Sequence, residues 1–444
     1  MKKLIAISVV FVLLASAAFA DVTVGAYSAF GVTVASGSSV EDSDVTTSFG
    51  GSANITVSGS NDDGTFGGLV RANASTPWYQ NDWEKPYWTT AAGFAYAWWK
   101  PIDQFKFQVG YNPDGDFPVN YIVGWGFHAS DAEDIVAYNG YGFTRGAVFY
   151  GGFADLGSVI TITPIEGLAI NLGIPFGGVP AGASSEGGYW EGYAEQAEDG
   201  SWGKWHGDDG NTSAVLGNVF SKLHAQISYD IAGVGLAALS YTGGLGYVKA
   251  EDSFQTAGGF PVDIIDPGAL YANFYLTSIA GLGLNLGLKF TFPIETEAKV
   301  KINSPIAAGF GVSYSDGDAF GVKSRLAATF GGSKQADGVD VVFDDPLVLG
   351  IDIMPYYDLG IMTFFFNAGL EIHAGNTELK NKGITVREKS DDVISWYINP
   401  FIAKAVGGGT FFAGVQIASD GSKDAKDNAI ITWAIPVGIV FGFW

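Results

Sequence analysis

The sequence contains no cysteine among its 444 residues, and this absence excludes several kinds of protein. Small exported domains usually depend on disulfides, so a chain without them must be stabilised by packing or by a closed network of backbone hydrogen bonds. Thiolate nucleophiles and cysteine-based metal sites are excluded as well. Charged residues are also scarce, because they make up 16% of the chain against about 25% in soluble domains.

Long hydrophobic runs are missing except at the N-terminus. A basic pair, Lys2-Lys3, precedes an apolar run from Leu4 to Ala15, and Ala18-Phe19-Ala20 has the small-x-small pattern of a cleavage site. We therefore expect residues 1–20 to be a signal peptide cleaved after Ala20; a retained N-terminal anchor helix is the alternative. The mature chain would have 424 residues, the 444 of the precursor less 20. Because no other apolar run reaches about 18 residues, helical membrane spans are not expected elsewhere.

Glycine and aromatic residues are abundant: the chain has 63 Gly, 32 Phe, 20 Tyr and 12 Trp. An exported chain that is apolar and aromatic, yet lacks long apolar runs, is typical of a membrane β-barrel, in which one face of each strand contacts lipid and the other contacts water. The formal net charge of −23 argues against nucleic acid as a partner.

Alternation of apolar and polar residues is the decisive pattern, because successive side chains of a strand point to opposite faces. In segment 429–443 the odd positions are all apolar, and segment 282–292 places Leu and Phe opposite Gly, Asn, Lys and Thr. Such runs extend over 10 to 15 residues, enough to cross a bilayer with tilt. Strands of a soluble β-sandwich, the alternative, average about five or six residues. The pattern predicts an all-β fold: a transmembrane antiparallel up-and-down β-barrel with an even strand number of 16–20.

Twenty segments are candidate strands. They are 22–34, 45–58, 64–75, 91–100, 103–111, 118–127, 143–151, 156–163, 166–176, 219–230, 233–243, 270–279, 282–292, 304–315, 318–331, 346–357, 360–373, 393–404, 409–419 and 429–443. Turn signals at 61–64, 315–318 and 358–360 predict short connections on one rim, and acidic stretches at 180–212, 251–268, 332–345, 374–392 and 420–428 predict long loops on the other. No linker divides the chain, so residues 21–444 are expected to form a single barrel domain with a long loop at 180–212.

The C-terminal residues carry a resemblance to a known class. Gly438-Ile439-Val440-Phe441-Gly442-Phe443 resembles the Gly-x-x-aromatic-x-aromatic signal of bacterial outer-membrane β-barrel porins, although Trp444 follows as one extra residue. Aromatic pairs that resemble interfacial girdles occur at Tyr87-Trp88, Trp98-Trp99, Tyr356-Tyr357 and Trp396-Tyr397. The resemblance implies a location in the cell outer membrane, contact with its lipids, and recognition of strand 429–444 by the barrel-assembly machinery. It also allows a homo-trimer, but no motif identifies a subfamily.

Catalytic and metal-binding signals are weak. The four histidines are His128, His206, His224 and His373, and none has the spacing of a catalytic triad or of a His-x-x-x-His metal pair. Segments 112–116 and 207–211 loosely resemble calcium loops but lack the distal Glu, and turn chemistry explains them. We expect neither an enzyme nor a metal site nor a cofactor; a hydrolase that uses His224 and His373 remains the alternative.

Strand parity predicts which charged residues line the pore. The expected pore-lining residues are Arg71, Lys106, Arg145, Lys222, His224, Asp230, Lys289, Lys323, Arg325, Asp352, Glu371 and His373. The long loop has the opposite charge and several aromatic rings. Its constriction candidates are Glu186, Tyr189, Trp190, Glu191, Glu195, Glu198, Trp202, Trp205, Asp208 and Asp209. A loop that folds inward would oppose acids to a basic wall and set ion preference; a loop that projects outward is the alternative.

These expectations converge on a channel for passive diffusion of small hydrophilic solutes and ions. Two other functions remain open. The barrel could display its acidic, aromatic loops as an adhesin or antigen, or it could be a selective transporter of sugars or hydrophobic solutes, with Trp190, Trp202 and Trp205 forming a pocket.

Overall fold

A computed structural model describes most of the chain after the expected signal peptide. The described residues are 21–40, 45–80, 89–111, 113, 153, 156–175, 192–196, 202–207, 222–244, 246–248, 256–257, 260–261, 264–296, 299–317, 319–336, 339–342, 346–381 and 384–443. Strands and their connections account for these ranges, and none of them contains a helix of the length and apolar character required to span a membrane.

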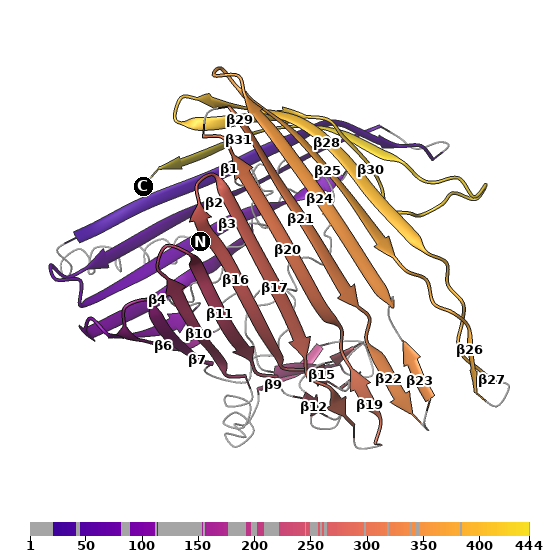
Figure 1. Cartoon of the computed structure of the whole chain (residues 1–444), viewed down its shortest axis with the longest axis horizontal. Helices are drawn as coiled ribbons and strands as arrows, with labels where there is room; N and C mark the ends of the chain where they lie inside the picture. The colour runs from indigo at the N-terminus through magenta and orange to yellow at the C-terminus, as the bar shows by residue number, and fades with distance from the viewer. Residues whose placement is uncertain are drawn as a thin grey trace.

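The main element is one antiparallel sheet whose strands follow each other around a barrel (Figure 1). Its strands are β1 (Asp21–Ser38), β2 (Thr46–Ser60), β3 (Phe66–Gln80), β4 (Thr89–Ile102), β5 (Phe105–Tyr111), β6 (Leu156–Ile165), β7 (Leu168–Pro175), β10 (His224–Ile231), β11 (Gly235–Thr242), β16 (Ala269–Ile279), β17 (Leu282–Thr291), β20 (Ile306–Ser315), β21 (Phe320–Phe330), β24 (Leu347–Asp358), β25 (Thr363–His373), β28 (Val393–Val406), β29 (Gly409–Gly414), β30 (Gln416–Ser419) and β31 (Thr432–Phe443).

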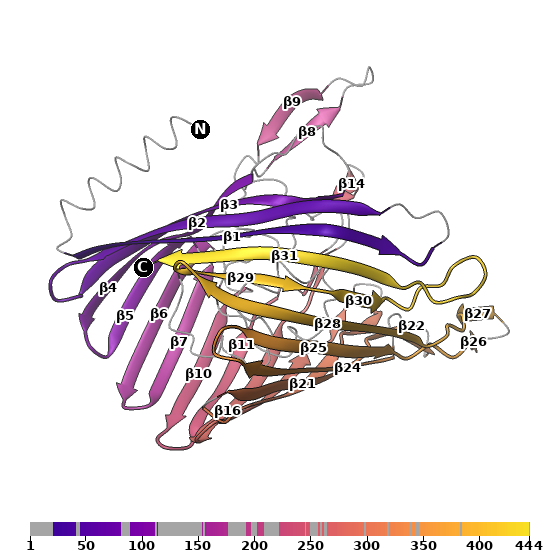
Figure 2. The same ribbon diagram turned by 90° about the horizontal axis from the view of Figure 1, so that it is seen from above.

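The barrel has 18 strands and is closed. The sheet contains 19 named strands, but β29 and β30 both pair with β28 on one side and β31 on the other, so they are two halves of one strand. Closure comes from the pairing of the first and last strands, which runs from Ala26 opposite Phe443 to Ser38 opposite Thr432. Both views show β1 beside β31 (Figures 1 and 2). Closure leaves no unpaired sheet edge, as a membrane-embedded sheet requires.

The alternation predicted from sequence sets the two faces of the wall. On β17, Leu286 and Leu288 are about half exposed on the outer face, while Asn285, which directly precedes Leu286, is buried on the inner face. On β24, Ile351 and Ile353 are exposed and Asp352 is buried. The outer surface is therefore apolar and the inner surface carries the polar side chains, which is the arrangement of a barrel that sits in lipid.

The connections alternate between short and long. Two to five residues join β2 to β3, β4 to β5, β6 to β7, β10 to β11, β16 to β17, β20 to β21, β24 to β25 and β28 to β29. These turns lie on one rim of the barrel. The N-terminal end of β1 and the C-terminal end of β31 lie on the same rim. All the longer connections are on the other rim, as predicted. We call these the turn rim and the loop rim.

Twelve short strands of the described part of the chain lie on the loop rim. They are β8 (Gly192–Gln196), β9 (Trp202–Gly207), β12 (Gly246–Val248), β13 (Thr256–Ala257), β14 (Phe260–Pro261), β15 (Ile264–Asp266), β18 (Ile294–Glu295), β19 (Lys301–Asn303), β22 (Ser333–Ala336), β23 (Val339–Val342), β26 (Leu379–Asn381) and β27 (Ile384–Arg387). β18, β19, β22 and β23 form a four-stranded sheet, and the others pair as hairpins. These short strands lie at and beyond the ends of the barrel strands (Figure 1).

Eighteen of the twenty predicted segments correspond to the barrel strands. The other two, 118–127 and 143–151, lie outside the described residues; β5 and β6, which flank them in sequence, pair directly with each other.

Candidate functional site: the inner wall of the barrel

The inner wall is lined by uncharged polar side chains between a few charged ones. The buried polar residues that lie on it include Thr56, Gln108, Thr161, Asn171, Gln226, Ser240, Asn273, Asn285, Asn367, Asn399 and Gln416. Some bond across strands: the Thr161 hydroxyl donates to Asn171 Oδ1 at 2.7 Å, and Gln226 Nε2 donates to Ser240 Oγ at 2.9 Å. Such a wall is hydrophilic without having a strong charge of either sign.

A cluster of three interacting residues, two of them charged, joins strands β21, β24 and β28. Arg325 Nε and Nη2 each lie 3.1 Å from Asp352 Oδ2, and Tyr397 donates its hydroxyl proton to Asp352 Oδ1 at 3.0 Å. The three residues meet because Arg325 and Asp352 are direct cross-strand partners, with Tyr397 two strands further on. The Asp352 side chain is fully buried, so its charge is compensated by Arg325.

Two further acid–base pairs lie toward the loop rim. Glu371 and His373, both on β25, form a contact between Oε1 and Nε2. Lys222 lies two residues before the start of β10 and pairs with Asp266 at the end of β15. His224 begins β10, and its ring meets that of Phe153 edge to face with centroids 5.2 Å apart. Lys222 is thus bound to a carboxylate before the strand begins.

Arg71 and Lys289 are held by aromatic rings. The Arg71 guanidinium lies 4.7 Å from the centroid of Phe94, and its Nε donates to Thr56 Oγ1 at 2.9 Å. Lys289 Nζ lies 5.6 Å from the centroid of Tyr271, which is its cross-strand partner. Both cations are partly exposed.

The remaining predicted pore residues have varied positions. Lys106 and Lys323 are on the inner face, since their cross-strand partners are Thr161 and Met354, and both interact with other residues. Asp230 is exposed next to the turn rim. Arg145 and His128 lie outside the described residues.

The constriction candidates are only partly described. Glu195 lies in β8, and Trp202, Trp205 and His206 lie in β9, which pairs with β8 in a hairpin. Figure 2 shows this hairpin standing away from the barrel wall. The other candidates, Glu186, Tyr189, Trp190, Glu191, Glu198, Asp208 and Asp209, lie outside the described residues, and inward folding of the loop stays a prediction.

Sequence reasoning missed an apolar cluster on the inner wall near the turn rim. Met354, Phe401 and Phe412 are buried there, and the Phe365 ring stacks on Phe401 with centroids 4.7 Å apart and an interplanar angle of 5°. Strand parity places these residues on the same face as Asp352. Reading parity along these strands would therefore have predicted apolar side chains on the inner wall. The inner wall is therefore not polar throughout.

The girdle prediction was wrong for half of each described aromatic pair. Adjacent residues of a strand point to opposite faces, so only one can face lipid. Trp99 is 53% exposed on the outside, whereas a side chain at Gly67 on the inner face would collide with Trp98. Tyr357 likewise faces outward, while Tyr356 lies near the ring of Phe365 on the inner face. Tyr397 is buried on the inner wall beside Asp352. Tyr87-Trp88 lies outside the described residues.

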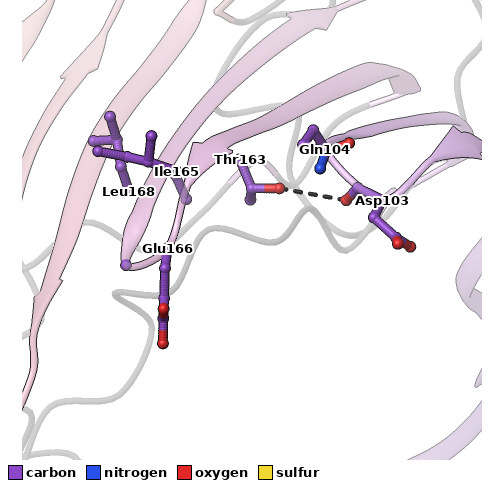
Figure 3. A pocket seen from close by; sticks show the side chains of 8 residues that line it. Asp103, Gln104, Thr163, Ile165, Glu166 and Leu168 are labelled. Carbon is purple, nitrogen blue, oxygen red and sulfur yellow. Dashed lines mark hydrogen bonds between the residues drawn. The ribbon is translucent and has the colours of Figure 1, made fainter.

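A shallow recess of about 310 Å³ opens at the turn rim between the β4–β5 and β6–β7 turns (Figure 3). Asp103, Gln104, Thr163 and Glu166 supply its polar lining, and the Thr163 hydroxyl donates to the backbone oxygen of Asp103 at 3.4 Å. Asp103 forms an ion pair with Lys100, which does not line the recess. Among the described residues there is no group of His, Cys, Asp and Glu that could hold a metal ion.

A closed, up-and-down barrel with an even number of antiparallel strands, an apolar exterior, a hydrophilic inner wall, and short turns opposite long loops has the architecture of an outer-membrane β-barrel. Two solved structures similar to the chain are Pseudomonas aeruginosa OpdL (10% identity, 96% of this chain and 100% of that one, TM-score 0.49) and P. aeruginosa OccK2, also called OpdF (12% identity, 96% and 99%, TM-score 0.49). OmpF of Salmonella typhi is similar over 95% of this chain and 97% of its own, with 10% identity and a TM-score of 0.44.

No protein-family model matches the chain, and no curated protein is detectably similar in sequence. At this identity and superposition the solved structures do not define a solute for this chain.

Proposed function

We propose that the protein is a channel for passive diffusion of small hydrophilic solutes and ions across the outer membrane. The observation that carries this proposal is the closed 18-stranded barrel with polar and charged side chains on its inner face. A barrel of this strand number encloses an interior wide enough for water unless the interior is plugged. Partly exposed cations such as Arg71 and Lys289 favour a hydrated interior, because an ammonium or guanidinium group is costly to bury without water or a counter-charge.

Reconstitution of the mature chain, residues 21–444, into a planar bilayer tests the proposal. Stepwise conductance increases that scale with salt concentration are expected. A folded barrel that inserts but conducts no ions would overturn it. We also infer that residues 1–20 are removed after Ala20 and that β31 is recognised by the assembly machinery; N-terminal sequencing of protein from outer membranes checks the first of these.

We further propose that loop 180–212 narrows the channel. Its support is the contrast between the acidic, aromatic loop and the cationic residues of the wall, since opposed charges at a narrow point select ions. Deletion of residues 186–209 is expected to raise single-channel conductance. An unchanged conductance would show that the loop stands clear of the pore.

A surface-display role is the second candidate, and the four-stranded sheet of β18, β19, β22 and β23 on the loop rim favours it. Ordered loop structure offers a firmer binding surface than an open coil. Two results together would support display over diffusion. Intact cells would bind host or matrix ligands and lose this binding when residues 332–345 are deleted, and the reconstituted protein would show no conductance.

A further inference from the structure

Charge compensation on the inner wall differs sharply from one cation to another. The Arg325 charge is compensated by buried Asp352, and the Lys222 charge by Asp266. A cation that pairs with a carboxylate at hydrogen-bond distance adds little to the field inside a pore, because the two charges cancel a few ångströms away. These two residues therefore contribute little to ion preference.

Arg71 has no such counter-charge. Its polar contacts among the described residues are one hydrogen bond, from Nε to the neutral Thr56 hydroxyl, and the face of the Phe94 ring. These contacts orient the guanidinium without neutralising it, and the two terminal nitrogens keep their donor hydrogens for a ligand. The side chain is half-buried, so it is held against the wall and still reaches the interior.

Lys289 is in the same situation on β17. Within the described part of the chain its ammonium contacts the Tyr271 ring and has no carboxylate partner. Its neighbours along the inner face of the strand, Gly287 and Asn285, are uncharged. The positive charge of Lys289 therefore acts on the interior uncompensated.

These two charges face each other across the barrel. Around the 18 strands, β3 and β17 are separated by eight steps in one direction and ten in the other, so they lie on nearly opposite sides. Among the inner-face carboxylates of the described barrel strands, Asp352 is buried beside Arg325, Glu371 is buried in contact with His373, and Asp230 and Asp358 are exposed at the turn rim. The middle of the described wall thus carries a net positive charge, although the whole chain carries −23.

We propose that the channel prefers small anions, such as chloride and short carboxylates, and that Arg71 and Lys289 are its specificity-determining residues. The inference rests on the proposed diffusion function and names the solute charge that this function favours. Opposed cations in a narrow aqueous interior bounded by low-dielectric walls raise the local concentration of anions. The acidic residues of the described loop-rim strands lie beyond the ends of the barrel strands, and their field is screened by salt over about 8 Å at physiological ionic strength.

The test is the reversal potential of the reconstituted mature chain in a KCl gradient. We expect a sign that reports chloride preference in 0.1 M salt, and a weaker preference at 1 M, where screening extends only about 3 Å. Arg71→Gln and Lys289→Gln are each expected to lower the chloride-to-potassium permeability ratio roughly fourfold, because one charge about 10 Å away in water changes the local concentrations of chloride and potassium about twofold each, in opposite directions. The double variant is expected to combine both losses.

Matched controls separate charge from packing. Arg71→Lys and Lys289→Arg keep the charge and are expected to keep the anion preference. Lys334→Gln removes one positive charge from the exposed loop-rim sheet and is expected to leave the permeability ratio unchanged. Folding of each variant is checked by its heat-dependent shift on a denaturing gel. Conductance with cation preference, or an unaltered ratio in the folded double variant, would overturn the inference while leaving the channel proposal standing; no conductance in the wild type would overturn the channel proposal itself.

Discussion

At the scale of single residues, the turn rim depends on glycines in the left-handed region of backbone conformation. Gly281 in the β16–β17 turn has a φ of +73°, and a Cβ there would lie 2.3 Å from the backbone oxygen of Ser315. Gly360 in the β24–β25 turn has a similar φ of +78°, but nothing lies within 4 Å of its Cβ position. A side chain at Gly360 would therefore meet backbone strain alone, whereas one at Gly281 would meet both backbone strain and a steric collision.

Gly360→Ala is expected to destabilise the barrel by about 1–2 kcal/mol, the cost of a left-handed conformation for an L-residue. Gly281→Ala is expected to cost more, because the strand of Ser315 must also move. Urea unfolding of the barrel in lipid vesicles, followed by tryptophan fluorescence, measures both. Equal losses at the two positions would contradict the collision at Gly281.

The buried ion pair on β21 and β24 gives a second residue-scale prediction. Asp352→Asn removes the carboxylate charge that Arg325, whose side chain is 13% exposed, pairs with, and is expected to cost about 3–5 kcal/mol. Asp103→Asn is the matched control, since Asp103 pairs with Lys100 while 91% exposed, and is expected to cost at most about 1 kcal/mol. The same vesicle unfolding experiment applies, and comparable losses would show that Asp352 is better solvated than its burial indicates.

At the scale of the strand, the face of a side chain decides the cost of a charge. Leu288→Lys places an ammonium on the outer face of β17, at a side chain that is 59% exposed toward lipid, and is expected to cost about 2–4 kcal/mol near the membrane centre. Leu359→Lys, at the turn rim and 57% exposed, is expected to cost about 0–1 kcal/mol near the interface. Equal tolerance of both lysines would mean that the outer face of β17 is not in contact with hydrocarbon.

Strand alternation also explains which sequence predictions succeeded. Reading parity from Leu282 to Phe292 was enough to put Lys289 on the inner face, because a one-residue shift would turn every leucine inward. The same rule, applied to Trp98-Trp99, would have shown that two adjacent aromatic residues cannot share a lipid-facing belt. The error came from assigning both residues of an aromatic pair to the same face, although strand parity already placed them on opposite faces.

At the scale of the whole molecule, closure depends on β31. Deletion of residues 432–443 would expose the pairing edges of β1, β29 and β30 together. Unpaired backbone groups are not tolerated in hydrocarbon, so this truncated chain is expected to show no heat-dependent gel shift and to aggregate. Deletion of residues 186–209 leaves every barrel pairing intact and is the control. A truncated chain that still inserts and shifts would mean that another pair of strands can close the barrel.

The sequence by itself determined the two faces of each strand, the division into short turns and long loops, and an even strand number, because these follow from local alternation and turn chemistry. Only the tertiary structure decided that 18 strands close the barrel, because pairing of β5 with β6 depends on partners far apart in the chain. It also decided which wall cations have counter-charges. Parity places Arg325 and Lys289 on the same face, but cross-strand register alone puts a carboxylate beside one and a tyrosine ring beside the other.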